Sequence, residues 1–229
     1  MKTIAQCVLA VSIALSLPHL AEARKHHGQP SEQAQQNQPG QFDYYVLSLS
    51  WSPDYCASHA NDTQQCGTGK QLGFVLHGLW PQFEKGYPSS CSDVALPADV
   101  KQQYAGLYPS PKLMLHEWQK HGTCSGLAPA DYLALSKKTK DAVNIPQRYQ
   151  RPAQPFRTTI DDVQKDFSAA NPGYSSDGIS ITCSGSSRFL QEVHLCLDKN
   201  GKSRSCAADV IKQMRSSCRQ PNFLVQSVR

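Results

Sequence analysis

The hydrophobic residues of the chain begin with one nearly uninterrupted run, residues 4–17, which follows the positive charge of Lys2. Pro18 ends the run, and residues 21–23 read Ala-Glu-Ala, the small-x-small pattern that signal peptidase cleaves. The run has about 14 residues, whereas a helix that spans a bilayer needs roughly 20. We therefore expect residues 1–23 to be a secretory signal peptide, and the mature protein to be secreted or periplasmic without a membrane anchor.

Polar residues dominate the next segment, 24–41, which is rich in Gln, Pro, His and Gly and has no hydrophobic periodicity. Such a composition predicts a disordered lead-in. At Phe42 the composition changes abruptly to aromatic and aliphatic residues. The rest of the 229-residue chain is long enough for a full core, so residues 42–229 are expected to form a single domain.

Two hydrophobic runs of the strand type open this domain. Residues 44–51 are aromatic and β-branched, and residues 72–79 form a second run that is ended by Trp80 and Pro81. The polar residues between the runs, 54–69, predict a loop.

The middle of the chain has the composition and punctuation of helices. Pro97 precedes the first stretch, Gly122 follows the second, and Thr159 can cap the last. The helices expected are 98–107, 113–120, 130–143 and 159–170. Strands are expected again at 178–183 and 189–198, followed by the hairpin turn signal Lys199-Asn200-Gly201.

Cysteine usage indicates an oxidising compartment. Of nine cysteines, Cys7 lies in the expected signal peptide. The mature chain keeps Cys56, Cys66, Cys91, Cys124, Cys183, Cys196, Cys206 and Cys218. An even number in an exported protein predicts four disulfides, and the C-x-x-C pairs of a metal site are absent from the sequence. Eight cysteines allow about 105 pairings, so the count alone does not select one.

These elements predict the fold class. Strands at both ends of the domain with helices grouped between them are typical of α+β proteins. We expect an antiparallel β-sheet core with several helices packed on it, stabilised by disulfides. The formal net charge of +5 is a mild basic bias, which suits a polyanionic ligand but is far below that of a charge-driven DNA binder.

The segment 116–124, His-Glu-Trp-Gln-Lys-His-Gly-Thr-Cys, carries the strongest chemical signal. Residues four apart lie on one helix face, which pairs Glu117 with His121 and His116 with Lys120. One turn of helix would then present a carboxylate, an ammonium group and two imidazoles.

A zinc site is the alternative for this segment. The metalloprotease signature H-E-x-x-H spaces its histidines four apart, whereas His116 and His121 are five apart. That spacing separates them by about 140° around a helix axis, so one face cannot aim both at a single ion. A zinc site with non-helical geometry remains the open alternative.

The segment 74–81, Phe-Val-Leu-His-Gly-Leu-Trp-Pro, places His77 at the end of an apolar strand. Gly78 permits a close approach or an unusual backbone conformation, and Trp80 offers a flat face on which a base could stack. Taken singly, His77 is also compatible with a satisfied core histidine and Trp80 with simple packing.

Together the two segments resemble the active-site motifs of the ribonuclease T2 family, H-G-L-W-P and H-E-W-x-K-H-G-T-C, without a break and in the family's order. The resemblance covers residues 42–218. It implies a ribonuclease T2-like catalytic domain, with His121 as the general base that deprotonates the ribose 2′-hydroxyl and His77 as the general acid that protonates the 5′-oxygen. Glu117 and Lys120 would stabilise the phosphorane, and His116 would hold the phosphate.

The resemblance further implies four disulfides: Cys56–Cys66, Cys91–Cys124, Cys183–Cys218 and Cys196–Cys206. It also points to residues that contact the base. Some members carry an acidic residue two positions after the motif tryptophan, whereas this chain has Gln82, an amide that both donates and accepts. Tyr87, or alternatively Phe83, would form the other wall of a base-stacking slot with Trp80. Low base specificity is therefore expected.

The function that follows is cleavage of single-stranded RNA by a metal-independent endoribonuclease through a 2′,3′-cyclic phosphate. We expect a monomer that needs no cofactor and does not cut DNA, which lacks the 2′-hydroxyl. A non-catalytic RNA-binding protein with the same fold is the alternative, which the presence of both motif histidines disfavours. Asn61 begins a glycosylation sequon, but the short leader and the sparse sequons favour a bacterial source.

Overall fold

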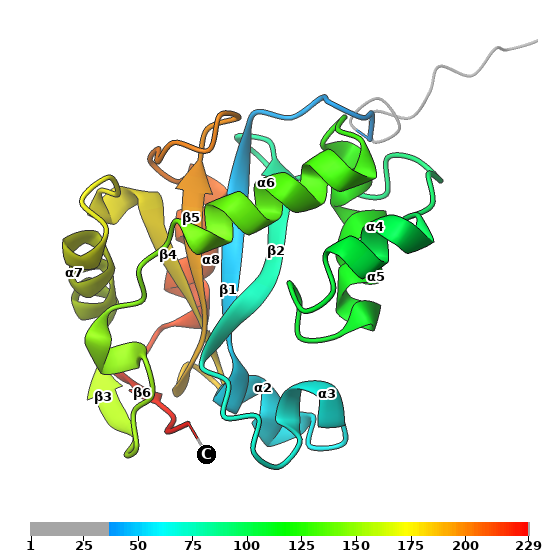
Figure 1. Ribbon diagram of the computed structural model, residues 1–229. Coiled ribbons are helices and arrows are strands. Elements are labelled where there is room, and N and C mark those ends of the chain that lie inside the picture. Colours follow the sequence, from blue (N-terminus) through cyan, green and yellow to red (C-terminus); the bar gives the residue numbers. More distant parts are fainter. Residues whose placement is uncertain (1–36, 229) are drawn as a thin grey trace, which may run out of the picture. The chain divides into compact units, whose positions relative to one another are not determined.

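A computed structural model describes residues 37–228 (Figure 1). In this part of the chain six strands form one sheet in the order β2-β1-β5-β6-β3, and β4 also pairs with β5. The strands are β1 Tyr44–Trp51, β2 Phe74–Gln82, β3 Phe156–Thr158, β4 Ile179–Ser184, β5 Phe189–Leu197 and β6 Phe223–Val225. All pairings are antiparallel except a short parallel contact between β5 and β6, so the sheet is mixed.

Helices cover the sheet on both faces, which confirms the expected α+β class. They are α2 Ser52–Ser58, α3 Thr63–Cys66, α4 Ala98–Gln103, α5 Pro111–Lys120, α6 Pro129–Asp141, α7 Ile160–Ala170 and α8 Ala208–Ser217. In Figure 1, α6 crosses in front of β1 and β2, α8 lies behind the sheet, and α5 lies beside β2. Short 3-10 turns are η1 Gly122–Cys124, η2 Gln147–Tyr149 and η3 Ser176–Gly178.

Local sequence explains where the helices begin. The hydroxyl of Ser110 accepts a hydrogen bond from the backbone N–H of Leu113 at the start of α5, and Pro111 is its first residue. Thr159 caps α7 in the same way by accepting from the backbone N–H of Asp162, as expected.

The sequence prediction was wrong at several elements. The segment 54–69 is not a loop but contains most of α2 and all of α3, because Pro53 suits the first turn of one helix and Asp62 caps the other by accepting from Gln65 N. Strand β2 continues through Pro81, since a proline without an N–H is tolerated in a strand at the sheet edge. Helix α8 and the three-residue strands β3 and β6 were not predicted.

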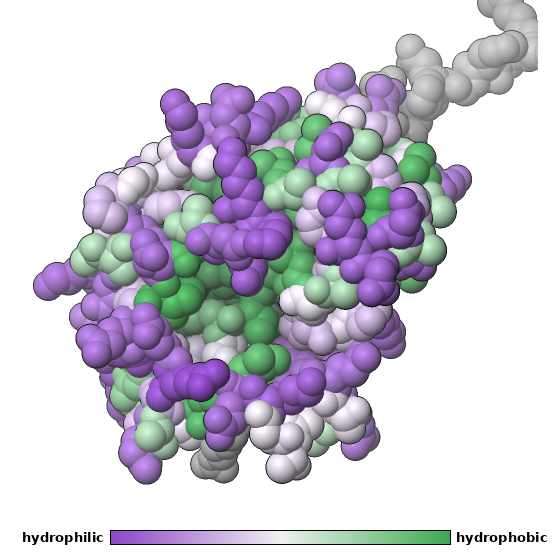
Figure 2. All heavy atoms as spheres, viewed as in Figure 1, coloured by the Kyte–Doolittle hydropathy of each residue, from purple (hydrophilic) through white to green (hydrophobic). Residues whose placement is uncertain are grey.

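Side chains of β1 alternate between two cores, as the period of a strand requires. Tyr45, Leu47, Leu49 and Trp51 join the larger core, which includes buried aromatic residues of α5, α6 and α7. Tyr44 and Val46 point the other way, into a smaller cluster with Cys196, Ala207 and Val210. On the face seen in Figure 2, hydrophilic side chains surround a hollow with an apolar floor.

Four disulfides stabilise the described residues, and their pairings are those that the family resemblance implies. They are Cys56–Cys66 between α2 and α3, Cys91–Cys124 at η1, Cys183–Cys218 between β4 and the end of α8, and Cys196–Cys206 across the turn after β5. Gly201 has φ of 80° in that turn, in agreement with the hairpin prediction.

The start of the folded domain differs from the expected boundary. Gly40 N donates to Cys124 O at 2.9 Å, and Ser89 N donates to Oδ1 of Asn37 at 3.0 Å, so residues 37–41 pack onto the domain. The expected signal peptide and most of the expected lead-in lie outside the described residues. Within the described residues, no helix is both long enough and apolar enough to cross a membrane.

Candidate active site

A β-bulge presents His77. Strand β1 pairs Ser48 with Gly78 and Leu49 with Leu76, so His77 is an extra residue with no partner across the ladder. Such a bulge breaks the alternation of the strand and redirects side chains. Leu76 and Leu79 therefore both point into the larger core although they are three apart, while His77 points to the opposite side.

A second bulge lies in β5. Strand β4 pairs Thr182 with Glu192 and Cys183 with Leu190, which leaves Gln191 without a partner. Gln191 and Glu192 consequently line the same cavity as His77, while Leu190 points into the core. Two bulges in strands far apart in the sequence thus direct polar residues toward one place.

Glu192 holds His77. Its Oε1 accepts a hydrogen bond from Nδ1 of His77 at 2.5 Å, and its Oε2 lies 2.8 Å from Nε2 of the buried His194. Sequence reasoning missed both Glu192 and His194. A signal was present, because both are polar positions that alternate with Val193 and Leu195 in a largely apolar strand.

Glu117 reaches the same imidazole from α5. Its Oε1 lies 3.6 Å from Nε2 of His77, and its Oε2 accepts a 2.7 Å hydrogen bond from the indole N–H of Trp80. A Cβ on Gly78 would lie 2.1 Å from Glu117 Oε2 and 2.2 Å from Trp80 Nε1. Gly78 is therefore required for space, so that this hydrogen bond can form.

His121 lies at the C-cap of α5, one residue beyond the helix, and its backbone N–H still bonds Glu117 O at 3.0 Å. Its ring is 5.3 Å from the ring of Trp80 and 6.3 Å from that of Tyr87. The Trp80 ring is also 5.1 Å from His77, so the indole lies between the two motif histidines. Nδ1 of His121 is buried and has no hydrogen-bond partner among residues 37–228.

The two histidines have opposite electrostatic environments. Burial lowers the pKa of His77, but the hydrogen bond and charge of Glu192, together with the charge of Glu117, outweigh it and raise the pKa above its usual value. Burial lowers the pKa of His121 to about 3, and the charges of Lys120 and His77 act in the same direction. One imidazole is favoured as a cation and the other as the neutral base.

The two carboxyl groups also differ. Burial raises the pKa of Glu117 to about 7, against the opposing effects of His77 and of the Trp80 hydrogen bond. Burial acts on Glu192 as well, but the hydrogen bonds from His194 and His77 outweigh it, and its pKa is lowered. Glu192 is therefore the fixed negative charge of the site.

Apart from Trp80, the residues that the resemblance assigns to substrate binding lie at the edge of this cluster. His116 is exposed on α5, and burial together with the charges of Lys120 and His77 lowers its pKa. Tyr87 is 53% exposed beside His121. Gln82 is buried at the end of β2, two residues after Trp80 and on the same side of the strand.

The segment that carries Tyr87 is fixed at both ends. Before it, Gly86 N donates to Oδ2 of Asp209 at 2.7 Å, and after it Ser90 N donates to Lys120 O at 2.8 Å. The Cys91–Cys124 disulfide adds a covalent link to η1, at the last residue of the segment 116–124.

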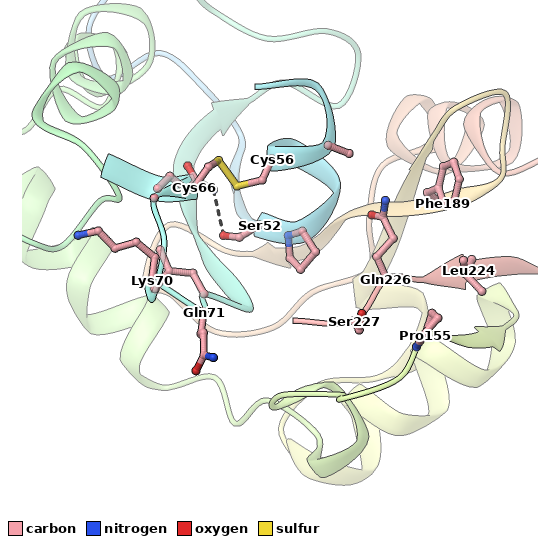
Figure 3. A pocket seen from close by; sticks show the side chains of 15 residues that line it. Ser52, Cys56, Cys66, Lys70, Gln71, Pro155, Phe189, Leu224, Gln226 and Ser227 are labelled. Carbon is pink, nitrogen blue, oxygen red and sulfur yellow. Dashed lines mark hydrogen bonds between the residues drawn. A yellow bond between two sulfur atoms is a disulfide. The ribbon is translucent and has the colours of Figure 1, made fainter. Parts of the chain in front are cut away.

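A cavity of about 420 Å³ adjoins His77; we call it the His77 cavity. His77, Gln191 and Glu192 border it on one side, and Tyr55 with the stacked ring of His59 on another. A neighbouring cavity of about 490 Å³ lies between the Cys56–Cys66 disulfide and β6, with Lys70 in its lining (Figure 3). Within residues 37–228, no group of three or more His, Cys, Asp or Glu side chains has a metal-binding arrangement.

Comparison with known proteins places the chain in a family. Residues 42–206 match the model of the Ribonuclease T2 family. A ribonuclease of Aeromonas hydrophila is 42% identical over 199 residues, which cover 83% of this chain and 88% of the relative. Ribonuclease DdI of Dictyostelium discoideum is 31% identical over 182 residues, with 73% and 78% covered.

A solved structure of an RNase MC1 variant in complex with 5′-UMP has a TM-score of 0.62, with 20% identity and with 80% of this chain and 97% of that one covered. This likeness supports the fold. The chain belongs to the ribonuclease T2 family. It is accordingly an endoribonuclease, an enzyme that acts on RNA.

Proposed function

We propose that the enzyme cleaves single-stranded RNA by transesterification, with His121 as general base and His77 as general acid. The observation that carries this proposal is the opposite shift in the pKa of two histidines that flank one indole ring. A general base must be neutral and a general acid must be protonated at the working pH, and the surroundings of each histidine favour that form.

The proposed first step forms one bond to phosphorus and breaks another. His121 removes the proton of the 2′-hydroxyl, and the 2′-oxygen attacks the adjacent phosphorus. The bond from phosphorus to the 5′-oxygen then breaks, and His77 gives its proton to that oxygen. The products are a 2′,3′-cyclic phosphate and a 5′-hydroxyl, and DNA is excluded because it has no 2′-hydroxyl.

Charge on the pentacovalent phosphorane is offset by groups of α5. The ammonium of Lys120 acts electrostatically on His77, His116 and His121, so it lies close enough to act on a phosphate among them as well. Glu117 has a pKa raised to about 7 and can hold a proton at acidic pH, when its carboxyl would donate to a phosphate oxygen. These groups supply the required charge, and we propose that the reaction needs no metal.

The base that precedes the cleaved phosphate would lie near Tyr87, Trp80 and Gln82. The exposed ring of Tyr87 supports a stacking role, whereas the indole N–H of Trp80 is already bonded to Glu117. Gln82 is an amide rather than a charged group, and low base specificity remains the expectation. The four disulfides support export, and we propose a secreted or periplasmic monomer made with residues 1–23 as signal peptide.

The test incubates the disulfide-bonded protein with a short single-stranded RNA in excess EDTA and identifies the product ends. Cyclic phosphate ends that disappear in His77→Ala and in His121→Ala, but persist in the exposed-lysine control Lys112→Ala, are expected. Cleavage that requires added zinc or magnesium would overturn the metal-independent mechanism. RNA binding without cleavage under any condition would favour the non-catalytic alternative.

A further inference from the structure

We propose that a groove lined by Arg157 and Arg188 binds a backbone phosphate of RNA that extends beyond the cleavage site on its 3′ side. The groove, of about 530 Å³, is bordered by Arg157 of β3, Arg188 before β5, Phe189, Leu224 and residues 220–222. We call it the arginine groove. This inference rests on the function proposed above, because the role of His77 sets the direction of the strand.

Both guanidinium groups are positioned and lack a counter-charge. Nη1 of Arg157 donates to Oδ1 of Asn222 at 2.7 Å, and Nε of Arg188 donates to Gly185 O at 2.7 Å. Within the described residues neither forms an ion pair, and no acidic residue lines the groove. Each guanidinium has five N–H donors, so several remain to bind a phosphate.

The backbone fixes Arg188 in place. Gly185, Ser186 and Ser187 have φ of 56°, 59° and 69°, so the turn before Arg188 adopts an unusual left-handed conformation. Arg188 N donates to Ser184 O at 2.9 Å, and Arg188 O accepts from Leu224 N at 2.8 Å. A turn of this kind persists only where neighbouring structure determines it, which fixes where the Arg188 side chain leaves the backbone.

The arginine groove continues from the active site. Phe189 borders both the arginine groove and the His77 cavity, and Figure 3 shows its ring beside Leu224. Arg188 precedes Glu192 by four residues, so their Cα atoms lie at most about 13 Å apart. Stacked nucleotides advance about 3.4 Å each, and an extended strand advances further, so roughly two to four nucleotides cover this distance.

The proposed role of His77 as general acid sets the direction of the RNA strand. His77 protonates the 5′-oxygen of the leaving nucleoside, so that nucleoside lies in the His77 cavity and the strand leads onward in the 3′ direction. The partly exposed ring of Phe189 offers a stacking surface for a base on the way. The arginine groove would then hold a phosphate that dinucleotide substrates do not have.

The test compares a dinucleotide with the same dinucleotide extended by five nucleotides on its 3′ side. Wild-type kcat/KM is expected to be about tenfold higher for the extended RNA, as an arginine–phosphate contact provides. Arg157→Gln/Arg188→Gln should lose that advantage and keep dinucleotide cleavage unchanged. The control Lys138→Gln/Lys165→Gln removes the same charge from exposed positions of α6 and α7 and should keep the advantage.

Binding gives a readout independent of catalysis. A 3′-extended oligonucleotide with a 2′-deoxy sugar at the cleavage site should bind the arginine variant more weakly, with a salt dependence shallower by about 0.7 for each phosphate that the variant no longer binds. Equal binding by variant and wild type, or an advantage only for 5′ extensions, would overturn the arginine groove. Failure of the wild-type enzyme to cleave the dinucleotide would instead count against the proposed mechanism. The binding comparison would still show whether the arginine groove binds RNA.

Discussion

Glu192 Oε1 lies 2.5 Å from Nδ1 of His77, and this contact sets the state of the proposed acid. The carboxylate accepts from Nδ1, so the other ring nitrogen, Nε2, faces Glu117 and can deliver a proton. His194 bonds the second carboxylate oxygen and holds Glu192 in orientation. Glu192 therefore acts as a positioning residue through His77.

The variant Glu192→Gln should lower kcat/KM by about tenfold or more. The wild-type His77 has a raised pKa, so activity should be present at low pH and should be lost as the pH rises through that pKa. Removal of the carboxylate charge lowers this pKa, and the alkaline limb of the kcat/KM profile should move to lower pH. An alkaline limb at its wild-type position would contradict the role, whatever the loss of stability.

Gly78→Ala should abolish most activity. The added methyl group would overlap the hydrogen bond between Trp80 and Glu117, with contacts near 2 Å that force one of them to move. We expect a loss of about 1–3 kcal/mol in unfolding free energy and a drop of at least about a hundredfold in kcat. Gly173→Ala, which adds its methyl group in open space, is the matched control and should leave both unchanged.

His121 should destabilise the fold in acid. Its pKa is lowered from 6.5 to about 3, so between these values the unfolded chain binds a proton that the folded one does not. Stability should therefore fall as the pH drops from about 6.5, and His121→Gln should reduce that fall. Urea unfolding at pH 7 and pH 4 measures the loss of unfolding free energy, with the exposed His59→Gln as control. If His121→Gln shows the same pH dependence as the wild type, the lowered pKa of His121 is refuted.

Removal of two different disulfides should separate stability from catalysis. Cys91 and Cys124 are 33 residues apart, Cys183 and Cys218 are 35 apart, and loss of either bond should cost about 2–4 kcal/mol. Only Cys91→Ala/Cys124→Ala should raise KM, because that bond ties the segment of Tyr87 to the end of α5. Steady-state kinetics at a temperature below the unfolding midpoints of both variants would show this difference in KM. Equal KM values would argue against a base-stacking slot at Tyr87.

Sequence reasoning identified the motif histidines because their signal is local and contiguous. The expected helix 113–120 ends at Lys120 in the structure as well, although it begins two residues earlier, and His121 is its C-cap. Glu192 and His194 could not be connected to His77 by sequence, since more than a hundred residues separate them. Their contact depends on strand order, which a single sequence does not specify.

The bulge at His77 was also not predicted from the hydrophobic pattern of the sequence. Leu76 and Leu79 are three apart, which fits neither the period of a strand nor a continuous apolar face. Because the side chains of a strand alternate with a period of two residues, this spacing would have indicated an inserted residue in the strand. The helices α2 and α3 were missed for another reason, because they are short and polar and depend on Pro53 and Asp62 for their starts.

Strand β2 lies at an edge of the sheet, where unpaired N–H and C=O groups can recruit a strand from another molecule. The bulge at His77 distorts this edge, Pro81 removes one of its donors, and α5 lies beside it. The inserted residue His77, the proposed acid, would thus also disfavour edge-to-edge aggregation of the protein. A deletion that straightened β2 would be expected to reduce solubility as well as turnover.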